Sequence, residues 1–306
     1  MGRAKEEACE AKMTHQKVFH KSVLLHEIID FLNPKTGDPI IDATIGGGGH
    51  AKGLIERGAR VLGIDRDPEA IIYLKNMNLP NLALARGNFA YIGKIGREFG
   101  FEKVQGIIFD LGVSSYQLET PQRGFSFQKD GPLDMRMDPT LQIRASDIIN
   151  RFEERRLYEI LKTYGQEKYS RRIARAICRS RKVKPIETTR DLAEIIEETV
   201  PRGVGGRNRK TKIHPATQTF QALRIVVNSE LLNLEEALPQ TVDLLAIGGR
   251  LAIISFHSLE DGIVKRFFKQ EVRFKVLTPK LIGPSQSEII ENPRSRSAKL
   301  RVAERI

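Results

Sequence analysis

The feature of this sequence that most restricts its fold is an alternation of short apolar runs with helical patterns between residues 23 and 110. Apolar residues at helical spacing occur at 23–32, and strand-like runs follow at 39–44, 60–65, 82–89 and 104–110. Helical patterns at 51–56 and 68–76 separate the first three runs. Because parallel strands need crossover connections, this alternation predicts an α/β fold around a parallel sheet.

The alternation stops after Asp110 and resumes only after Pro215. Residues 112–139 show little periodicity, and residues 145–200 predict successive charged helices without a strand. A helical stripe from Ala216 to Leu231 and strand patterns at 251–256, 274–277 and 299–303 would complete a sheet of about seven strands. We therefore expect an N-terminal tail at 1–15, a core made of 16–117 and 216–306, and an inserted helical domain at 118–215.

A glycine-rich turn lies where the first predicted strand passes into a helix. The turn comprises Gly46 to Gly49, and glycines there permit positive φ while the helix N-terminus presents free N–H groups. Asp65, nineteen residues after Gly46, ends the next strand, where a carboxylate can accept both hydroxyls of a ribose. This pattern predicts a nucleoside site, with a tight turn and a solvated aspartate as the alternative.

Two further strand ends bear on which cofactor is bound, because the glycine pattern alone also suits a nicotinamide dinucleotide. Asn88 and Phe89 are expected to end the third strand, where the ring could lie on an adenine. Asp110 ends the fourth strand, where its carboxylate would face whatever lies beside the cofactor. Phe89 could equally be a core residue. Polar and aromatic groups at four strand ends favour S-adenosylmethionine.

The chain carries a surplus of positive charge that is clustered. Lys and Arg total 50 against 38 Asp and Glu, which gives a net charge of +12. The run 168–184 holds no acid, and at helical spacing its Arg171, Arg175 and Arg179 share one face while Ile173 and Ile177 share another. A second run, 202–212, includes the basic residues Arg207, Arg209 and Lys210. These runs predict an RNA-binding surface, with a solvated face as the alternative.

Other function classes lack the residues they need. Cys9 and Cys178 are far apart and in no paired motif, so neither a disulfide framework nor a cysteine zinc site is expected, and we assign no metal site. No apolar run approaches the ~18–20 residues that span a bilayer. The first residues include glutamates and no apolar stretch, unlike a signal peptide. A cytoplasmic protein without membrane contact is expected.

A series of motifs extends over most of the chain. The first is the glycine-rich block at 42–50, which lies between the motifs at 20–25 and 63–68. Further motifs lie at 110–115, 123–127, 131–137, 214–217, 220–225, 256–261 and 292–297. In this order the motifs resemble those of the bacterial small-subunit ribosomal RNA cytosine-N4 methyltransferases. The sequence departs from the family at Gly262, Gln166 and Lys168, where the family usually has Arg, Glu and Arg.

The resemblance implies a class I methyltransferase sheet, of Rossmann-like type, with an inserted all-helical substrate-recognition domain. It implies S-adenosylmethionine as cofactor and N4-methylcytidine in the decoding region of 16S rRNA, within the small ribosomal subunit, as product. Gly46 follows from the turn itself, and the resemblance places cofactor contacts on Gly48, Gly49, His50, Asp65, Phe89, Asp110 and Gln117. Of these, His50 and Gln117 rest on the resemblance alone.

The residues also limit the chemistry. Methylation of a cytosine ring carbon usually needs a cysteine nucleophile, and neither cysteine lies in a strand-end motif, whereas an exocyclic amine needs only positioning and hydrogen acceptors. Asp110, Ser114 and Ser115 are the candidate acceptors. The candidate rings for holding the base, each with core packing as the alternative, are Tyr116, Phe125, Phe127 and Phe256. A DNA amino-methyltransferase and a non-catalytic ribosome-binding protein remain alternative functions, with a nicotinamide enzyme last.

Overall fold

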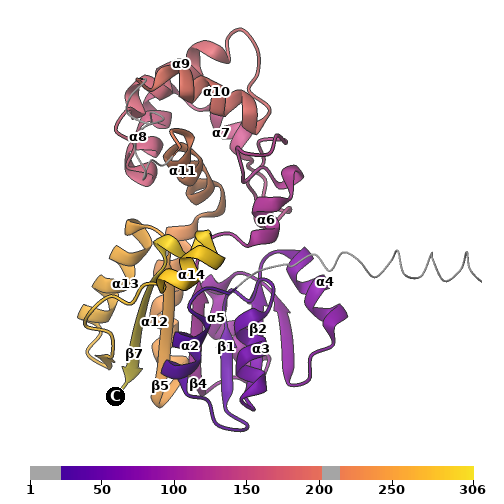
Figure 1. Ribbon diagram of the computed structural model, residues 1–306, viewed down its shortest axis with the longest axis vertical. Helices are drawn as coiled ribbons and strands as arrows, with labels where there is room; N and C mark the ends of the chain where they lie inside the picture. Colours follow the sequence, from indigo (N-terminus) through magenta and orange to yellow (C-terminus); the bar gives the residue numbers. More distant parts are fainter. Residues whose placement is uncertain (1–21, 202–213) are drawn as a thin grey trace, which may run out of the picture.

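The computed structural model describes residues 22–201 and 214–306, which form a lower α/β part and an upper helical part (Figure 1). The α/β part holds a seven-stranded sheet of order β3-β2-β1-β4-β5-β7-β6. All neighbouring strands are parallel except where β7 runs antiparallel to β5 and β6. The strands are β1 (Pro39–Asp42), β2 (Arg60–Asp65), β3 (Leu82–Arg86), β4 (Val104–Asp110), β5 (Leu245–Ser255), β6 (Phe274–Val276) and β7 (Lys299–Arg305).

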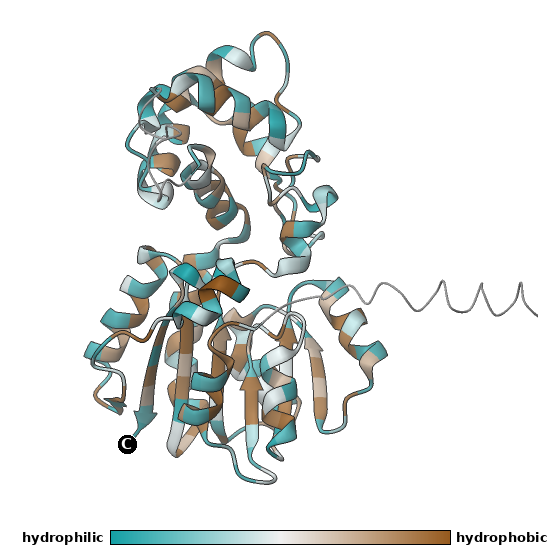
Figure 2. Cartoon of the chain, viewed as in Figure 1, coloured by the Kyte–Doolittle hydropathy of each residue, from teal (hydrophilic) through white to brown (hydrophobic). Residues whose placement is uncertain are grey.

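Helices cover both faces of the sheet, which is why the central strands are apolar runs and not alternating patterns. Ile40 packs with α2 (Leu25–Leu32), α3 (Gly49–Glu56) and α4 (Pro68–Met77) on one face. Its neighbour Ile41 packs with α5 (Ile92–Glu98), α12 (Glu230–Leu244) and α13 (Ser258–Gln270) on the other. Successive residues of a strand point to opposite faces, so one short run serves two cores. In Figure 2 the strands are largely brown between helices with teal outer faces.

The upper part is built from helices with a separate apolar cluster. The expected succession of helices over 145–200 is present, with no strand among these residues. Ile173 and Ile177 are fully buried in this cluster beside Leu157 and Leu223. The helices are α7 (Ala145–Arg151), α8 (Glu154–Gly165), α9 (Ser170–Ser180), α10 (Thr189–Thr199) and α11 (Ala216–Asn228), reached from β4 through α6 (Ser115–Glu119) and η2 (Pro121–Arg123).

Several expected element bounds are wrong. The strand expected at 251–256 runs from Leu245 to Ser255. The stripe from Ala216 to Leu231 is divided between α11 and α12, because Ser229 adopts a left-handed conformation at φ 50°. The third strand ends at Arg86 and not at Phe89, since Asn88 caps a 3-10 turn, η1 (Phe89–Tyr91). The helix after the glycine turn begins at Gly49, two residues before the first apolar position.

The packing of α11 bears on the expected division of the chain. Its buried side chains, among them Phe220 and Leu223, belong to the helical cluster, although residues 216–306 were assigned to the core. The chain therefore returns to the sheet only with α12, whose Leu234 and Leu238 belong to the same apolar cluster as Ile41, on one face of the sheet. No helix among residues 22–201 and 214–306 is long and apolar enough to cross a membrane. The tail at 1–15 lies outside the described residues.

Candidate active site

A pocket lies over the carboxyl ends of β1, β2, β4 and β5. These strand ends lie at the edge of the sheet that faces the helical part (Figure 1). Chain direction diverges here, because β1 connects to β2 on one side and neighbours β4 on the other. Ligands of open α/β sheets bind at such a switch point. The predicted site residues that line the pocket are Gly46, Gly49, His50, Asp65, Phe89, Asp110, Ser114 and Gln117.

The glycine turn forms one wall of the pocket. Gly46 and Gly48 have φ of 48° and 77°, in the left-handed region that favours glycine. Gly48 caps α3, and a Cβ on it would lie 2.5 Å from Cδ2 of Leu74. A Cβ on Gly49 would collide with the hydroxyl of Ser22. The glycines therefore let the turn pack closely against Leu74 and Ser22, and the start of α3 presents its free N–H groups beside the pocket.

Asp65 is fixed between the ends of two neighbouring strands. Its Oδ2 accepts a hydrogen bond from Gly46 N at 2.9 Å, and its Oδ1 accepts one from Asp67 N at 2.9 Å. Burial raises the pKa of Asp65 to about 6, against the opposing effect of the two N–H groups. The Asp65 carboxyl is thus mainly ionised at neutral pH. A carboxylate has about four acceptor sites, and the N–H groups of Gly46 and Asp67 use two of them, which leaves two for ribose hydroxyls. This arrangement fits the nucleoside end of the cofactor.

Asp67, beside this site, was not singled out from the sequence. Its buried carboxylate accepts from Nε2 of Gln117 at 2.7 Å and lies 2.8 Å from Nη1 of Arg123. Gln117 also forms a capping box with Ser114 at the start of α6. Gln117 therefore lines the pocket while it holds Asp67, and its direct contact with the cofactor stays a prediction. Asp67 belongs to the segment 63–68 that carries the resemblance, but it had no assigned role there.

Phe89 closes the β3 side of the pocket. Its ring meets that of Phe109 edge to face, with 5.5 Å between centroids. The guanidinium of Arg66 lies 5.7 Å from the Phe89 ring and donates to Asn88 Oδ1 and to Asn228 O. Burial lowers the pKa of Arg66. Phe89 is thus both packed against the core and available at the pocket, so the two interpretations of this ring are compatible.

Asp110 and His50 meet on the β4 side. His50 Nε2 bonds to the carbonyl of Val23 at 2.9 Å, and since a carbonyl only accepts, that nitrogen carries the proton. His50 Nδ1 then faces Asp110, 3.8 Å from its Oδ2. Asp110 N donates to Thr44 Oγ1 at 2.6 Å, which joins the end of β4 to the residues after β1. The histidine that the resemblance added is therefore buried beside the predicted acid.

The two candidate serines differ in position. Ser114 lines the pocket, and its hydroxyl accepts from Gln117 N at 3.2 Å as the cap of α6. Ser115 is the first residue of α6 and is not among the described residues that line the pocket. The pocket thus brings Asp110 and Ser114 together, and the part proposed for each serine stays a prediction.

Sequence reasoning missed the acidic wall on the β5 side. Glu230 and Glu260 line the pocket, and Glu230 is held by Arg224 through two hydrogen bonds of 2.8 and 2.9 Å. Burial opposes ionisation of Glu260, but contacts with His257 and Arg224 prevail and lower its pKa. Glu260 and His257 belong to the motif at 256–261, so the signal was present but carried no assigned role.

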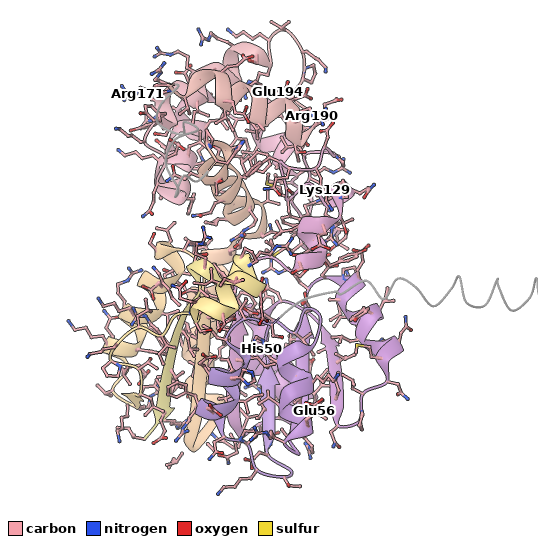
Figure 3. The ribbon with its side chains drawn as sticks, in the orientation of Figure 1. His50, Glu56, Lys129, Arg171, Arg190 and Glu194 are labelled. Atoms are coloured by element: carbon pink, nitrogen blue, oxygen red, sulfur yellow. The ribbon has the colours of Figure 1, made fainter. Side chains whose placement is uncertain are left out.

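The predicted RNA-binding arginines lie far from this pocket. Arg171, Arg175 and Arg179 are exposed on α9, and they border a groove with Glu198 and Thr199 of α10. Figure 3 shows Arg171 at the outer end of the helical part, while His50 lies in the α/β part. The α9 face was thus predicted correctly as a basic side opposite a buried one. Arg207, Arg209 and Lys210 lie outside the described residues.

A sheet of this order, with antiparallel β7 inserted before the edge strand and a nucleoside-type pocket over β1 and β2, defines a class I S-adenosylmethionine-dependent methyltransferase. The chain belongs to the MraW methylase family, whose model matches residues 17–306. The expected sheet, cofactor and family are thereby confirmed.

Two relatives match nearly the whole length of the chain. A ribosomal RNA small subunit methyltransferase H from Deinococcus deserti is 47% identical, covering 96% of this chain and 95% of that protein. The protein of the same name from Syntrophotalea carbinolica is 44% identical, covering 96% and 100%. Among solved structures, an rRNA methylase from Streptococcus thermophilus has a TM-score of 0.44 at 14% identity, covering 94% of this chain and 98% of that one.

Proposed function

We propose that this protein transfers a methyl group to the exocyclic N4 of a cytidine in the decoding region of 16S rRNA, within the small ribosomal subunit. The observation that carries the proposal is the pocket in which Asp65 and Asp110 lie at the two sides of the glycine turn. The relatives named as small-subunit rRNA methyltransferases support the substrate class. The compartment that this substrate implies is the cytoplasm.

Cofactor binding and methyl transfer would involve residues on different sides of the pocket. Asp65, Gly46 and Phe89 would hold the nucleoside of S-adenosylmethionine at the β2 and β3 side. When bound there, the cofactor would supply a sulfonium methyl group: the N4 lone pair would form the new N–C bond, the S–C bond would break with its electrons going to sulfur, and N4 would release one proton. Asp110, at the end of β4, would lie beside the reacting group.

Asp110 is the acceptor that we assign to the amine hydrogen and the released proton. The lone pair of a cytosine amine is conjugated into the ring, so an acceptor must draw the hydrogens out of the plane. The bond from Asp110 N to Thr44 and the contact with His50 fix the position of this carboxyl group. Ser114, and Ser115 next to it, would accept the second hydrogen. The scheme needs no covalent enzyme intermediate, because N4 attacks the methyl carbon directly. Cys178 lies on α9 and is not among the described residues that line the pocket.

The helical insertion is the part that we assign to recognition of the rRNA. Its α9 arginines form an exposed basic face beside the groove with α10, and Arg207, Arg209 and Lys210 add charge in the same region of the sequence. Phosphate contacts of this kind depend on shape and charge more than on base sequence. The catalytic core would then act on a base that the insertion helps to present.

Nucleoside mass spectrometry of 16S rRNA from cells that lack the gene tests the proposal. N4-methylcytidine should be lost and should return with the intact gene, but not with Asp110→Asn. Asp243→Asn, an exposed carboxyl at the end of α12, is the matched control and should restore the nucleoside. Unchanged N4-methylcytidine in the deletion strain would refute the assignment. Methyl transfer by the purified protein to duplex DNA but not to small subunits would instead indicate a DNA methyltransferase.

A further inference from the structure

Four aromatic residues were candidates for holding the acceptor base, and the structure separates them. Phe125 is buried in the helical cluster, and Phe127 stacks on His214 with 4.4 Å between ring centroids. Neither these two nor Tyr116 is among the described residues that line the pocket, whereas Phe256 is. Phe256 is half-buried: it packs against the cluster that contains Ile40, and it also lines the pocket.

The order of the strands sets the order in which the candidate site residues lie across the pocket. Phe89 follows β3, Asp65 ends β2, the glycine turn follows β1, and Asp110 ends β4. The next strand along is β5, and Phe256 is the first residue after it. A cofactor whose nucleoside lies at Asp65 would have its reacting end near Asp110, which would leave the part of the pocket on the β5 side for the acceptor. Phe256 is the ring on that side.

The distance between Phe256 and the loop after β4 is set by the sheet. Asp110 pairs with Ile254, which places Gly112 and Phe256 each two residues beyond the pair. Gly112 has φ of 100°, and a Cβ on it would lie 3.6 Å from Cδ2 of Phe256. Gly112 therefore lies close to the edge of the Phe256 ring. A planar group on Phe256 would lie near the loop that follows Asp110, two residues from the proposed proton acceptor.

Buried charged side chains lie beside Phe256, and one of them bonds to its backbone. Phe256 N donates to Glu260 Oε2 at 2.8 Å, and Glu260 is 2% exposed. Arg224 pairs with Glu230 on the adjacent helices α11 and α12, and its Nη1 approaches the same Gly112 position at 4.0 Å. The hydrogen bond to Glu260 fixes the backbone of Phe256 and therefore the point from which its ring projects.

Three side chains in this region are spaced like the ligands of a metal site, but their ligand atoms already take part in hydrogen bonds within the protein. One ligand atom each from Glu230, His257 and Glu260 lie within 4.8 Å of one another. Both Glu230 oxygens accept from Arg224, and Glu260 Oε2 accepts from backbone N–H groups. His257 Nδ1 accepts from Glu260 N at 3.4 Å, which leaves the ring proton on Nε2, the atom that a cation would need. The cluster is therefore better suited to positioning.

We propose that the acceptor cytosine stacks on Phe256, with N4 directed toward Asp110, and that Glu260 is a positioning residue for this ring. The assignment rests on the proposed function and adds the subsite for the base. Stacking on an aromatic ring is tolerant of base identity, so Phe256 supplies affinity and orientation, while the acceptor at Asp110 selects an amine.

Methylation of purified small subunits by full-length variants tests this subsite. Phe256→Tyr keeps a ring and should stay within about threefold of wild type, whereas Phe256→Leu keeps apolar volume without a ring and should lower kcat/KM about 5- to 100-fold. Cofactor Kd should be unchanged in both. Phe89→Leu, at the opposite end of the pocket, is the matched control and should raise cofactor Kd.

Equal kcat/KM for Phe256→Leu and Phe256→Tyr would overturn the proposal, because packing alone would then explain the ring. If Phe256→Leu also weakens cofactor binding, Phe256→Met replaces it as the variant without a ring, with the same two outcomes. Glu260→Gln should lower kcat/KM in wild type but hardly further in Phe256→Leu, and full additivity would remove its positioning role. A wild-type protein that transfers no methyl to cytidine N4 would refute the proposed function itself, whatever the variants do.

Discussion

Nη1 of Arg123 lies 2.8 Å from the carboxylate of Asp67, and both side chains are largely buried, at 11% and 3% exposure. Arg123 belongs to η2, on the way into the helical part, while Asp67 follows β2 and donates its N–H to Asp65. Arg123 also donates to the carbonyls of Arg136 and Met137. One guanidinium thus connects the residues after β4 to the loop that fixes the nucleoside carboxylate.

Arg123→Met should destabilise the protein and weaken cofactor binding together. The variant leaves Asp67 buried with Gln117 as its remaining side-chain partner, and removing one member of a buried ion pair costs about 3–5 kcal/mol. Arg86→Met breaks the exposed pair with Asp138 and should cost less than about 1 kcal/mol. Urea unfolding and calorimetric titration with the cofactor measure both effects. Equal losses for the two variants would contradict the connection.

Cofactor affinity should depend on pH through Asp65. Its pKa in the folded protein is about 6, above the ordinary 3.8, so the apoprotein gains stability from the protonated form below pH 3.8 and loses that gain as pH rises through 6. Ribose hydroxyls donate to the ionised form, so binding requires the proton to leave. Affinity should therefore be constant above pH 7 and fall about tenfold per unit below pH 6.

Asp65→Asn separates this effect from others. An amide does not titrate, so the variant should bind the cofactor weakly at every pH, with no break near 6. The stability of its apoprotein should lack the change with pH that Asp65 gives wild type, although the amide has only one acceptor oxygen for the N–H groups of Gly46 and Asp67. Calorimetry across pH 5–8 checks the first expectation and thermal melting the second. A wild-type affinity that is flat over this range would argue against Asp65 as the ribose acceptor.

The α9 arginines should contribute affinity that salt weakens. Replacing Arg171, Arg175 and Arg179 with Gln should weaken binding to small subunits and reduce the slope of log K against log salt by about 2 to 3. A control with the same loss of charge replaces three exposed residues of the α/β part, Lys52, Arg57 and Lys75. Filter binding at several salt concentrations measures the slope. If the control lowers the slope as much, net charge and not the α9 face explains binding.

The sequence was sufficient where local pattern decides the structure. Ile40 and Ile41 could be assigned to a central strand, because a strand that is buried on both faces is a continuous apolar run without alternation. The helix α9 could be predicted because Ile173 and Ile177 recur at helical spacing. The break at Ser229 was not predictable, since no glycine or proline interrupts the apolar stripe there.

The candidate site shows the same division. Asp65 and Asp110 were found because strand ends meet at one edge of a parallel sheet. The pairing of Arg224 with Glu230, and of Asp67 with Arg123, depends on how separate helices and loops pack, and neither spacing nor composition contains that information. Residues that position other groups are therefore the ones that sequence reasoning missed.

Gly48 offers a test of the glycine turn in which conformation and contact can be separated. Gly48 and Gly100 have nearly equal φ, 77° and 75°, so alanine costs about 1–2 kcal/mol of backbone strain at either position. A Cβ at Gly100 meets nothing within 4 Å, whereas at Gly48 it reaches Leu74 at 2.5 Å, beside the start of α3. Gly48→Ala should therefore lower stability more than Gly100→Ala does and should also weaken cofactor binding. Gly100→Ala should leave the affinity unchanged, and equal effects of the two variants on affinity would show that the turn acts only through general stability.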